Sequence, residues 1–162
     1  MMNSMIKKMV LLVVLCLTTI AFGYAQERSK AEIKISEIVK RYEEVKGVEC
    51  VTVVKGRGLG LVKMSFNQQY GKDFMKGVTG ITIIEYGDAS PETCEALHRE
   101  LDGFVGLLEE FNLGEEEELS KNDYARSFAS IVDEETISDF IIAIEDKESK
   151  VIMYMSGKMK LK

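Results

Sequence analysis

The sequence predicts an α+β fold: a two-layer sandwich in which helices pack on one face of a mixed sheet with a C-terminal antiparallel meander. Two segments, residues 30–46 and 91–112, carry apolar side chains every three or four positions, as helices with one buried face do. The runs between and after them are rich in β-branched residues, which favour strands. Short acidic turns separate the last runs, and connections of that length join antiparallel strands.

The composition is that of one globular domain with a substantial core. The chain of 162 residues is 46% hydrophobic and 30% charged, and it contains one histidine, three cysteines and no tryptophan. This balance excludes collagen-like, disulfide-dense and disordered chains. We therefore expect residues 26–162 to form a single α+β domain.

Residues 1–25 are predicted to be a secretory signal peptide. Lys7 and Lys8 form a basic segment, an apolar run follows over residues 9–20, and Gly23 and Ala25 place small residues before a cleavage site. The run is shorter than the ~20 apolar residues of a membrane span. We expect cleavage after Ala25, no stable membrane span afterwards, and a location in the periplasm or cell envelope.

The charge of the processed chain restricts its partners. Residues 26–162 carry 19 basic and 27 acidic side chains, a formal charge of −8. Without a basic stripe, such a chain is not expected to bind nucleic acid or anionic membranes. Cys50 and Cys94 remain in an oxidising compartment, where a disulfide between them is chemically feasible. Because free cysteines are commonly buried as small apolar side chains, we favour two free thiols.

The first helix is predicted over residues 30–46. Ser29 and Glu32 stand in a capping-box pattern at its start. Gly47 stands where a left-handed residue ends a helix. The apolar stripe consists of Ala31, Ile35, Ile38, Tyr42 and Val45.

Two buried strands are predicted next, over residues 48–55 and 80–86. The segment between them, residues 59–76, is ambiguous. Val62, Met64 and Phe66 alternate like a strand, whereas the same region with Phe74 and Met75 also suits short helices.

The second helix, over residues 91–112, has the strongest periodicity in the chain. It begins with Ser90 and with Pro91 at its first position, where a missing N–H costs nothing. Its stripe consists of Cys94, Leu97, Leu101, Phe104, Leu108 and Phe111. The remaining strands are predicted over residues 119–121, 124–132, 137–145 and 150–156.

Three strings in this framework resemble a group of small exported proteins of unknown function from Bacteroidetes. They are residues 47–53 (GVECVTV), residues 78–84 (VTGITII) and the ending 151–161 (VIMYMSGKMKL). The resemblance implies an exported α+β domain with a C-terminal meander and a helical segment after the first strand. It therefore favours helix for residues 59–76, and it implies no functional residue.

One helical triplet has the spacing of a metal site. Glu95, His98 and Asp102 lie on a common face of the second helix and offer three possible ligands. A structural site needs further ligands to close it, so we favour a solvent-facing His98 paired with Asp102, and no metal.

No motif for a chemical reaction is present. Gly56, Gly58 and Gly60 precede Leu61, so the pattern G-x-G-x-x-G is incomplete, and G-x-S-x-G, C-x-x-C and H-E-x-x-H do not occur. We expect a protein that is not an enzyme and that uses no cofactor. The preferred function is an exported binding or interaction protein with an envelope protein as its partner. The alternative is a small-ligand or lipid-binding domain with an apolar pocket between helices and sheet.

Overall fold

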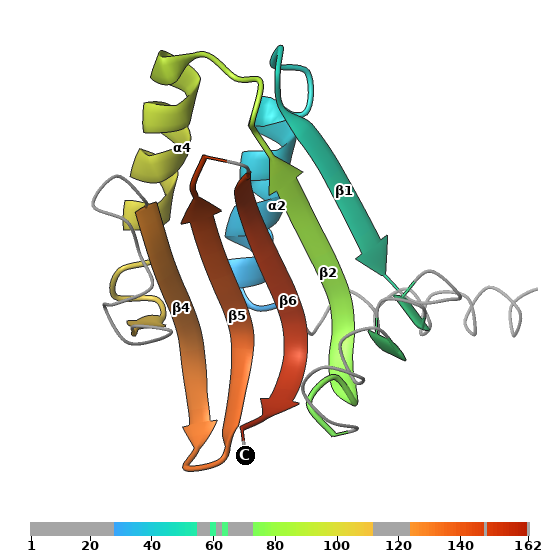
Figure 1. Ribbon diagram of the computed structural model, residues 1–162. Coiled ribbons are helices and arrows are strands. Elements are labelled where there is room, and N and C mark those ends of the chain that lie inside the picture. The colour runs from blue at the N-terminus through green and yellow to red at the C-terminus, as the bar shows by residue number, and fades with distance from the viewer. Residues whose placement is uncertain are drawn as a thin grey trace, which may run out of the picture.

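The computed structural model describes residues 28–54, 59–60, 63–64, 73–111, 124–147 and 149–161. One sheet of six strands, in the order β1-β2-β6-β5-β4-β3, carries helices α2 (Lys30–Tyr42) and α4 (Pro91–Asp102) on one face (Figure 1). The strands are β1 (Glu49–Val54), β2 (Gly77–Glu85), β3 (Glu109–Glu110), β4 (Tyr124–Asp133), β5 (Thr136–Glu145) and β6 (Lys150–Lys160). The predicted signal peptide (residues 1–25) and the predicted strand at 119–121 lie outside the described residues.

The predicted fold class, a two-layer sandwich with a mixed sheet, is wrong. All neighbouring strands of the sheet pair antiparallel. The sheet also dominates the described fold, since four of its strands have nine to eleven residues while the two helices have 13 and 12. The long connection after β1 leads to β2, which lies beside β1 and runs in the opposite direction. A connection of that length permits a parallel crossover but does not require one.

The start of α2 confirms the predicted cap, and its end comes earlier than predicted. The Ser29 hydroxyl accepts a hydrogen bond of 3.0 Å from the Glu32 N–H. The helix ends at Tyr42 rather than at residue 46, with Glu43 as its C-cap. Gly47 does have a left-handed backbone (φ 83°), but it belongs to the turn that leads into β1. A Cβ atom at Gly47 would collide with the backbone carbonyl of Asp88.

Helix α4 is shorter than the predicted helix over residues 91–112. It ends at Asp102, with Gly103 as its C-cap, and Gly106 turns the chain with a left-handed φ of 85°. Phe104 is buried and its ring lies 6.2 Å from that of Phe128. In the sequence, Phe104 continues the three- and four-residue spacing of the apolar stripe, but in the structure it lies after the end of α4. Of the predicted stripe, Cys94, Leu97 and Leu101 are the buried members that lie on α4.

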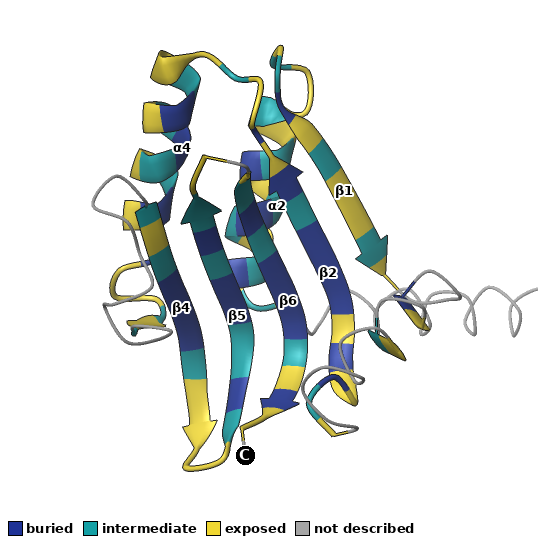
Figure 2. Cartoon of the chain, viewed as in Figure 1, coloured by how far each residue is buried: buried dark blue, intermediate teal, exposed yellow. Residues whose placement is uncertain are grey.

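Apolar side chains are buried on both faces of the sheet. Figure 2 shows buried stretches along β2, β4, β5 and β6. The face toward α2 and α4 contributes Ile84, Ile141 and Ile152 to one cluster. The opposite face contributes Ile81 and Met155, among others, to a second cluster. The described parts of residues 59–76 are helical at 59–60 and 63–64 and form a turn at 73–76. In the part of the chain that the structure describes, no helix has the length and apolar character to cross a membrane.

Candidate functional site

Beneath α2, the helix-facing side of the sheet changes from aliphatic to hydroxyl-bearing residues. One row across the strands consists of Cys50, Ile84, Ile152 and Ala143. The next row on the same face consists of Thr52, Thr82, Tyr154 and Ile141, and Ser156 follows opposite Gly80. Thr82 and Ser156 are only 7% and 8% exposed. Buried hydroxyls at a helix–sheet interface are an informative departure from an apolar core.

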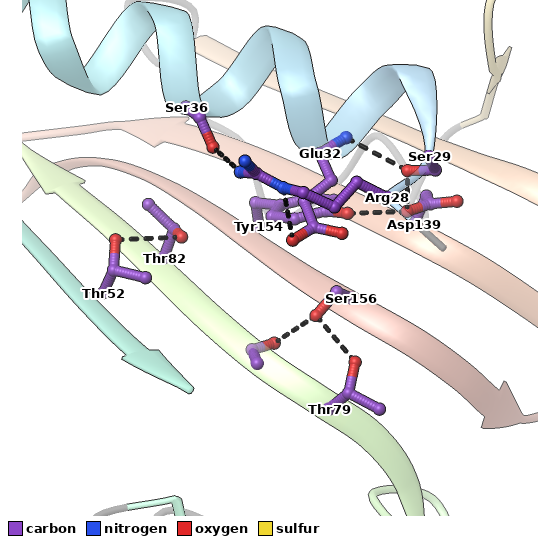
Figure 3. Close-up of polar contacts among 11 residues, drawn as sticks. Arg28, Ser29, Glu32, Ser36, Thr52, Thr79, Thr82, Asp139, Tyr154 and Ser156 are labelled. Carbon is purple, nitrogen blue, oxygen red and sulfur yellow. Dashed lines mark hydrogen bonds and ion pairs between the residues drawn. The ribbon is translucent and has the colours of Figure 1, made fainter. Parts of the chain in front are cut away.

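These hydroxyls line a cavity of about 270 Å³ between α2 and the strands β1, β2 and β6. Figure 3 shows the side chains that converge there from the helix and from the sheet. The helix contributes Glu32, Ile35 and Ser36, Arg28 lies just before it, and Val54 and Gly80 complete the wall on the sheet side. Most of the lining residues carry a polar group, although carbon atoms make up the larger part of the surface that faces the cavity.

The hydroxyls on the sheet are joined by short polar contacts. The hydroxyl oxygens of Thr52 and Thr82 are 3.2 Å apart. The Ser156 hydroxyl donates to the Gly80 carbonyl at 3.3 Å and lies 3.0 Å from the Thr79 hydroxyl. A hydroxyl can donate one hydrogen bond and accept two, so these contacts leave capacity for a further partner.

One wall of the cavity is held in place by the carboxylate of Asp139, a residue with an uncommon backbone conformation. Asp139 has a φ of 52° at a bulge in β5, a left-handed conformation that non-glycine residues seldom adopt. Its Oδ1 accepts hydrogen bonds from the Tyr154 hydroxyl at 2.6 Å and from the Ser29 hydroxyl at 2.7 Å. Asp139 thus links the cap of α2 to β6.

Burial and the hydrogen bond to Asp139 stabilise the protonated form of the Tyr154 phenol. Burial and, after it, the hydrogen bond to Asp139 raise the pKa of Tyr154 well above its usual value. The protonated phenol donates a hydrogen bond to the carboxylate. Such a donor holds the ring of Tyr154 in one position in the cavity wall.

The mouth of the cavity carries one charge of each sign. The Arg28 Nε donates to the Glu32 carboxylate at 3.2 Å, and the Arg28 Nη2 donates to the Ser36 hydroxyl. The Arg28 side chain is 48% exposed, so this ion pair lies at the rim. Because the two charges compensate each other, the mouth does not select strongly for an ion.

The three candidate metal ligands on α4, Glu95, His98 and Asp102, do not converge on one point. The Glu95 carboxylate lies 3.9 Å from Arg99, and the Asp102 carboxylate accepts from Arg126 at 2.7 Å. His98 instead contacts Glu145, with 2.8 Å between Nε2 and Oε2. Among the residues described, no group of three or more His, Cys, Asp and Glu side chains is arranged to hold a metal ion.

The predicted pairing of His98 with Asp102 is also wrong. The imidazole stacks on the Tyr124 ring with a centroid distance of 3.9 Å and an interplanar angle of 7°. Its Nε2 also lies 3.3 Å from the Tyr86 hydroxyl. The His98 Nε2 and Glu145 Oε2 atoms are close to each other, but their geometry is not that of a hydrogen bond. These partners come from β4, β5 and the end of β2, so they are long-range contacts that helical spacing cannot reveal.

The same contacts extend to one of the two cysteines. Lys150 lies 3.4 Å from the Glu145 carboxylate and 3.8 Å from the Cys94 sulfur. Cys94 is buried, whereas Cys50 is half-buried in β1, and burial raises the pKa of the Cys50 thiol. Both thiols are free in the structure. The preference for free thiols in the exported protein stays a prediction.

Sequence reasoning missed the hydroxyl-lined cavity. Threonine is an ordinary strand residue, and Thr52 and Thr82 are far apart in the chain. Only the register of β1, β2 and β6 brings them together.

Comparisons with protein-family models, with curated proteins and with solved structures found no match for this chain.

Proposed function

We propose that the protein is an exported, non-enzymatic binding protein, and that the cavity beneath α2 holds a small neutral molecule that carries hydroxyl groups. The observation that carries this proposal is the replacement of aliphatic by hydroxyl-bearing residues across three strands, at Thr52, Thr82, Tyr154 and Ser156. Without a ligand to bind, an aliphatic row would fill this interface better.

The chemistry of the lining selects the class of ligand. Hydroxyl groups both donate and accept, so they match the hydroxyl groups of a sugar or another polyol. The compensated pair Arg28 and Glu32 at the mouth adds no net charge. The volume of about 270 Å³ lies just below the roughly 300–1,000 Å³ of pockets for drug-sized ligands, which favours a ligand about as large as one sugar unit.

Two features distinguish this proposal from other functions. Hydroxyl groups from three strands converge on the cavity, which favours a ligand with hydroxyl groups over a lipid chain. The lining includes neither histidine nor cysteine, and this favours binding over nucleophilic catalysis. Export rests on the signal peptide predicted at residues 1–25 and on the resemblance to small exported proteins of Bacteroidetes.

The proposal is tested by titration of the isotope-labelled mature protein with a panel of monosaccharides and short polyols. We expect at least one of them to shift backbone amide signals of Ser36, Thr52 and Thr82 in nuclear magnetic resonance spectra. Signals on α4 should stay unchanged. If no member of the panel shifts these signals, the proposed ligand class is wrong.

Matched variants locate the binding site. Thr82→Val and Ser156→Ala each remove one hydroxyl group with little change in shape, and each should weaken binding about 2- to 10-fold. Ile152→Val, on the same face of β6 but in the aliphatic row, is the control and should bind like the parent. Equal affinity of all three variants would place the ligand elsewhere.

A further inference from the structure

The two edges of the sheet differ in their protection against an additional strand. At one edge, β3 has two residues, and both are glutamates. At the other edge, β1 has six residues and pairs with β2 without a register shift. Proteins usually protect edges with short strands, charged residues, prolines or bulges. From Cys50 to Val54, β1 has none of these protections.

The free edge of β1 presents hydrogen-bonding groups and apolar side chains together. Within the described parts of the chain, β1 pairs with β2 alone. Every second residue of such a strand directs its N–H and C=O groups away from its partner. Val51 and Val54 are 53% and 61% exposed, and Figure 2 shows β1 without a buried residue. The edge therefore offers backbone groups and side-chain area to another extended segment.

The start of β1 carries uncompensated negative charge. Glu49 of β1 lies directly opposite Glu85 of β2, and like charges in this position repel each other. Neither carboxylate forms an ion pair with a described residue. Both line a surface depression of about 780 Å³ that contains six carboxylates (Glu43, Glu44, Glu49, Glu85, Asp88 and Asp146) and three lysines (Lys46, Lys147 and Lys150). A basic side chain placed here would relieve the repulsion.

We propose that β1 is a docking edge, at which an extended segment of a partner protein adds antiparallel to β1 and places a basic side chain beside Glu49 and Glu85. Main-chain hydrogen bonds to β1 would supply affinity, and side chains on alternate positions would supply specificity. A second copy of this chain fits the edge less well, because residues 26–162 carry a formal charge of −8 and its own β1 begins with a glutamate.

This docking edge adjoins the cavity beneath α2, because Val54 lines the cavity and is also exposed at the edge, but the two sites use different groups. The edge uses the outward backbone groups of β1 and the carboxylates at its start, whereas the cavity uses hydroxyl side chains that face α2. Either one can therefore fail in experiment without the other.

The backbone pairing is tested with a synthetic peptide of alternating threonine and valine that ends in lysines. Because the peptide pairs antiparallel, its C-terminal lysines lie beside Glu49. We expect the peptide to slow amide hydrogen exchange at alternate residues of β1 in the mature protein. Two N-methylated forms of the peptide, blocked on either one or the other set of alternate residues, should differ at least about tenfold in affinity. Equal affinity of the two forms would overturn the proposal.

The charge preference is tested with variants at both edges. Glu49→Lys and Glu85→Lys should each weaken binding of the lysine-ended peptide about two- to fivefold and strengthen binding of a glutamate-ended peptide. Glu109→Lys at the opposite edge is the control and should leave both affinities unchanged. Equal binding of both peptides by the parent would contradict the basic partner. Sedimentation that shows a dimer through β1 in the absence of peptide would instead identify a second copy as the occupant.

Discussion

The Tyr154 hydroxyl donates a hydrogen bond of 2.6 Å to the carboxylate of Asp139 across β5 and β6. The same carboxylate oxygen accepts from Ser29, whose hydroxyl caps α2. A residue in an uncommon backbone conformation thus joins the start of a helix to the wall of the cavity. Residues held in sparsely populated conformations occur preferentially at functional sites, and the left-handed Asp139 beside the cavity is consistent with the proposed ligand site.

Replacement of Asp139 should test its acceptor role and its left-handed backbone together. Asp139→Ala leaves two hydroxyl groups without an acceptor and puts an unfavourable residue at φ 52°, so it should lower the free energy of unfolding by about 1–3 kcal/mol. Asp139→Asn keeps an acceptor oxygen and tolerates the left-handed backbone, so its loss should be smaller. Urea denaturation measures both. Equal losses for the two variants would contradict the acceptor role.

The stability of the protein should fall at alkaline pH. The pKa values of Tyr154 and Tyr86 are raised above the ordinary value of 10.0, chiefly by burial. Above that value the unfolded chain loses these protons while the folded chain keeps them. The contribution of these two phenols to the free energy of unfolding should therefore be complete below about pH 10 and decrease as the pH rises further. Urea denaturation at several pH values, with tyrosinate absorbance as a second signal, measures this.

A matched variant checks the assignment of this alkaline transition. Tyr154→Phe removes one of the two phenols, so the decrease in stability above pH 10 should become less steep than in the parent. A slope that is the same in the variant and in the parent would show that other groups cause it.

The buried side of α4 should carry much of the stability of the helix-facing cluster. Leu101 is fully buried there, so Leu101→Ala should lower the free energy of unfolding by about 2–5 kcal/mol through lost burial and a residual cavity. Val105→Ala, at an exposed position shortly after the helix, is the control and should change it by less than about 0.5 kcal/mol. Similar effects of the two variants would mean that α4 does not pack as described.

The histidine on α4 should also contribute to stability, contrary to a surface interpretation of His98. Its ring stacks on Tyr124 and lies beside Glu145, so His98→Ala should cost about 1–2 kcal/mol. Arg99→Ala, the next residue on the exposed side, should cost little. If thermal melts show the same midpoint for His98→Ala as for the parent, the stacking contributes nothing.

Cys50 and Cys94 should both be free thiols. Cys94 is buried on α4 and Cys50 is half-buried in β1, as separate thiols. Titration of the denatured, unreduced mature protein with a thiol reagent should find both groups reactive. Finding neither reactive would show that the two residues form a disulfide.

Local signals in the sequence predict parts of this fold correctly. The pattern at Ser29 and Glu32 predicts the cap of α2, and Pro91 marks the start of α4. Cys94, Leu97 and Leu101 are buried, as their spacing indicates. These features depend on neighbouring residues alone, so local rules suffice for them.

The remaining features depend on contacts between distant segments. The prediction of a mixed sheet is wrong because strand direction depends on which strands become neighbours. Strand β6 lies between β2 and β5 and is antiparallel to both, and no local pattern specifies that arrangement. The end of α4 was missed because Phe104 keeps the helical spacing while it packs on Phe128. The cavity could not be found because its hydroxyls become neighbours only through strand register.

The central claim, that the cavity beneath α2 is a ligand site, is tested most directly by filling it. Ser36 lies in the cavity wall, so Ser36→Phe should occupy the space with a ring. Ile33→Phe makes a similar change at an exposed position of the same helix and serves as the control. The measurement is the dissociation constant, by isothermal titration calorimetry, of the monosaccharide or polyol that binds the parent. We predict that Ser36→Phe abolishes binding while thermal stability is retained and Ile33→Phe binds like the parent; unchanged affinity of a folded Ser36→Phe protein would contradict the claim.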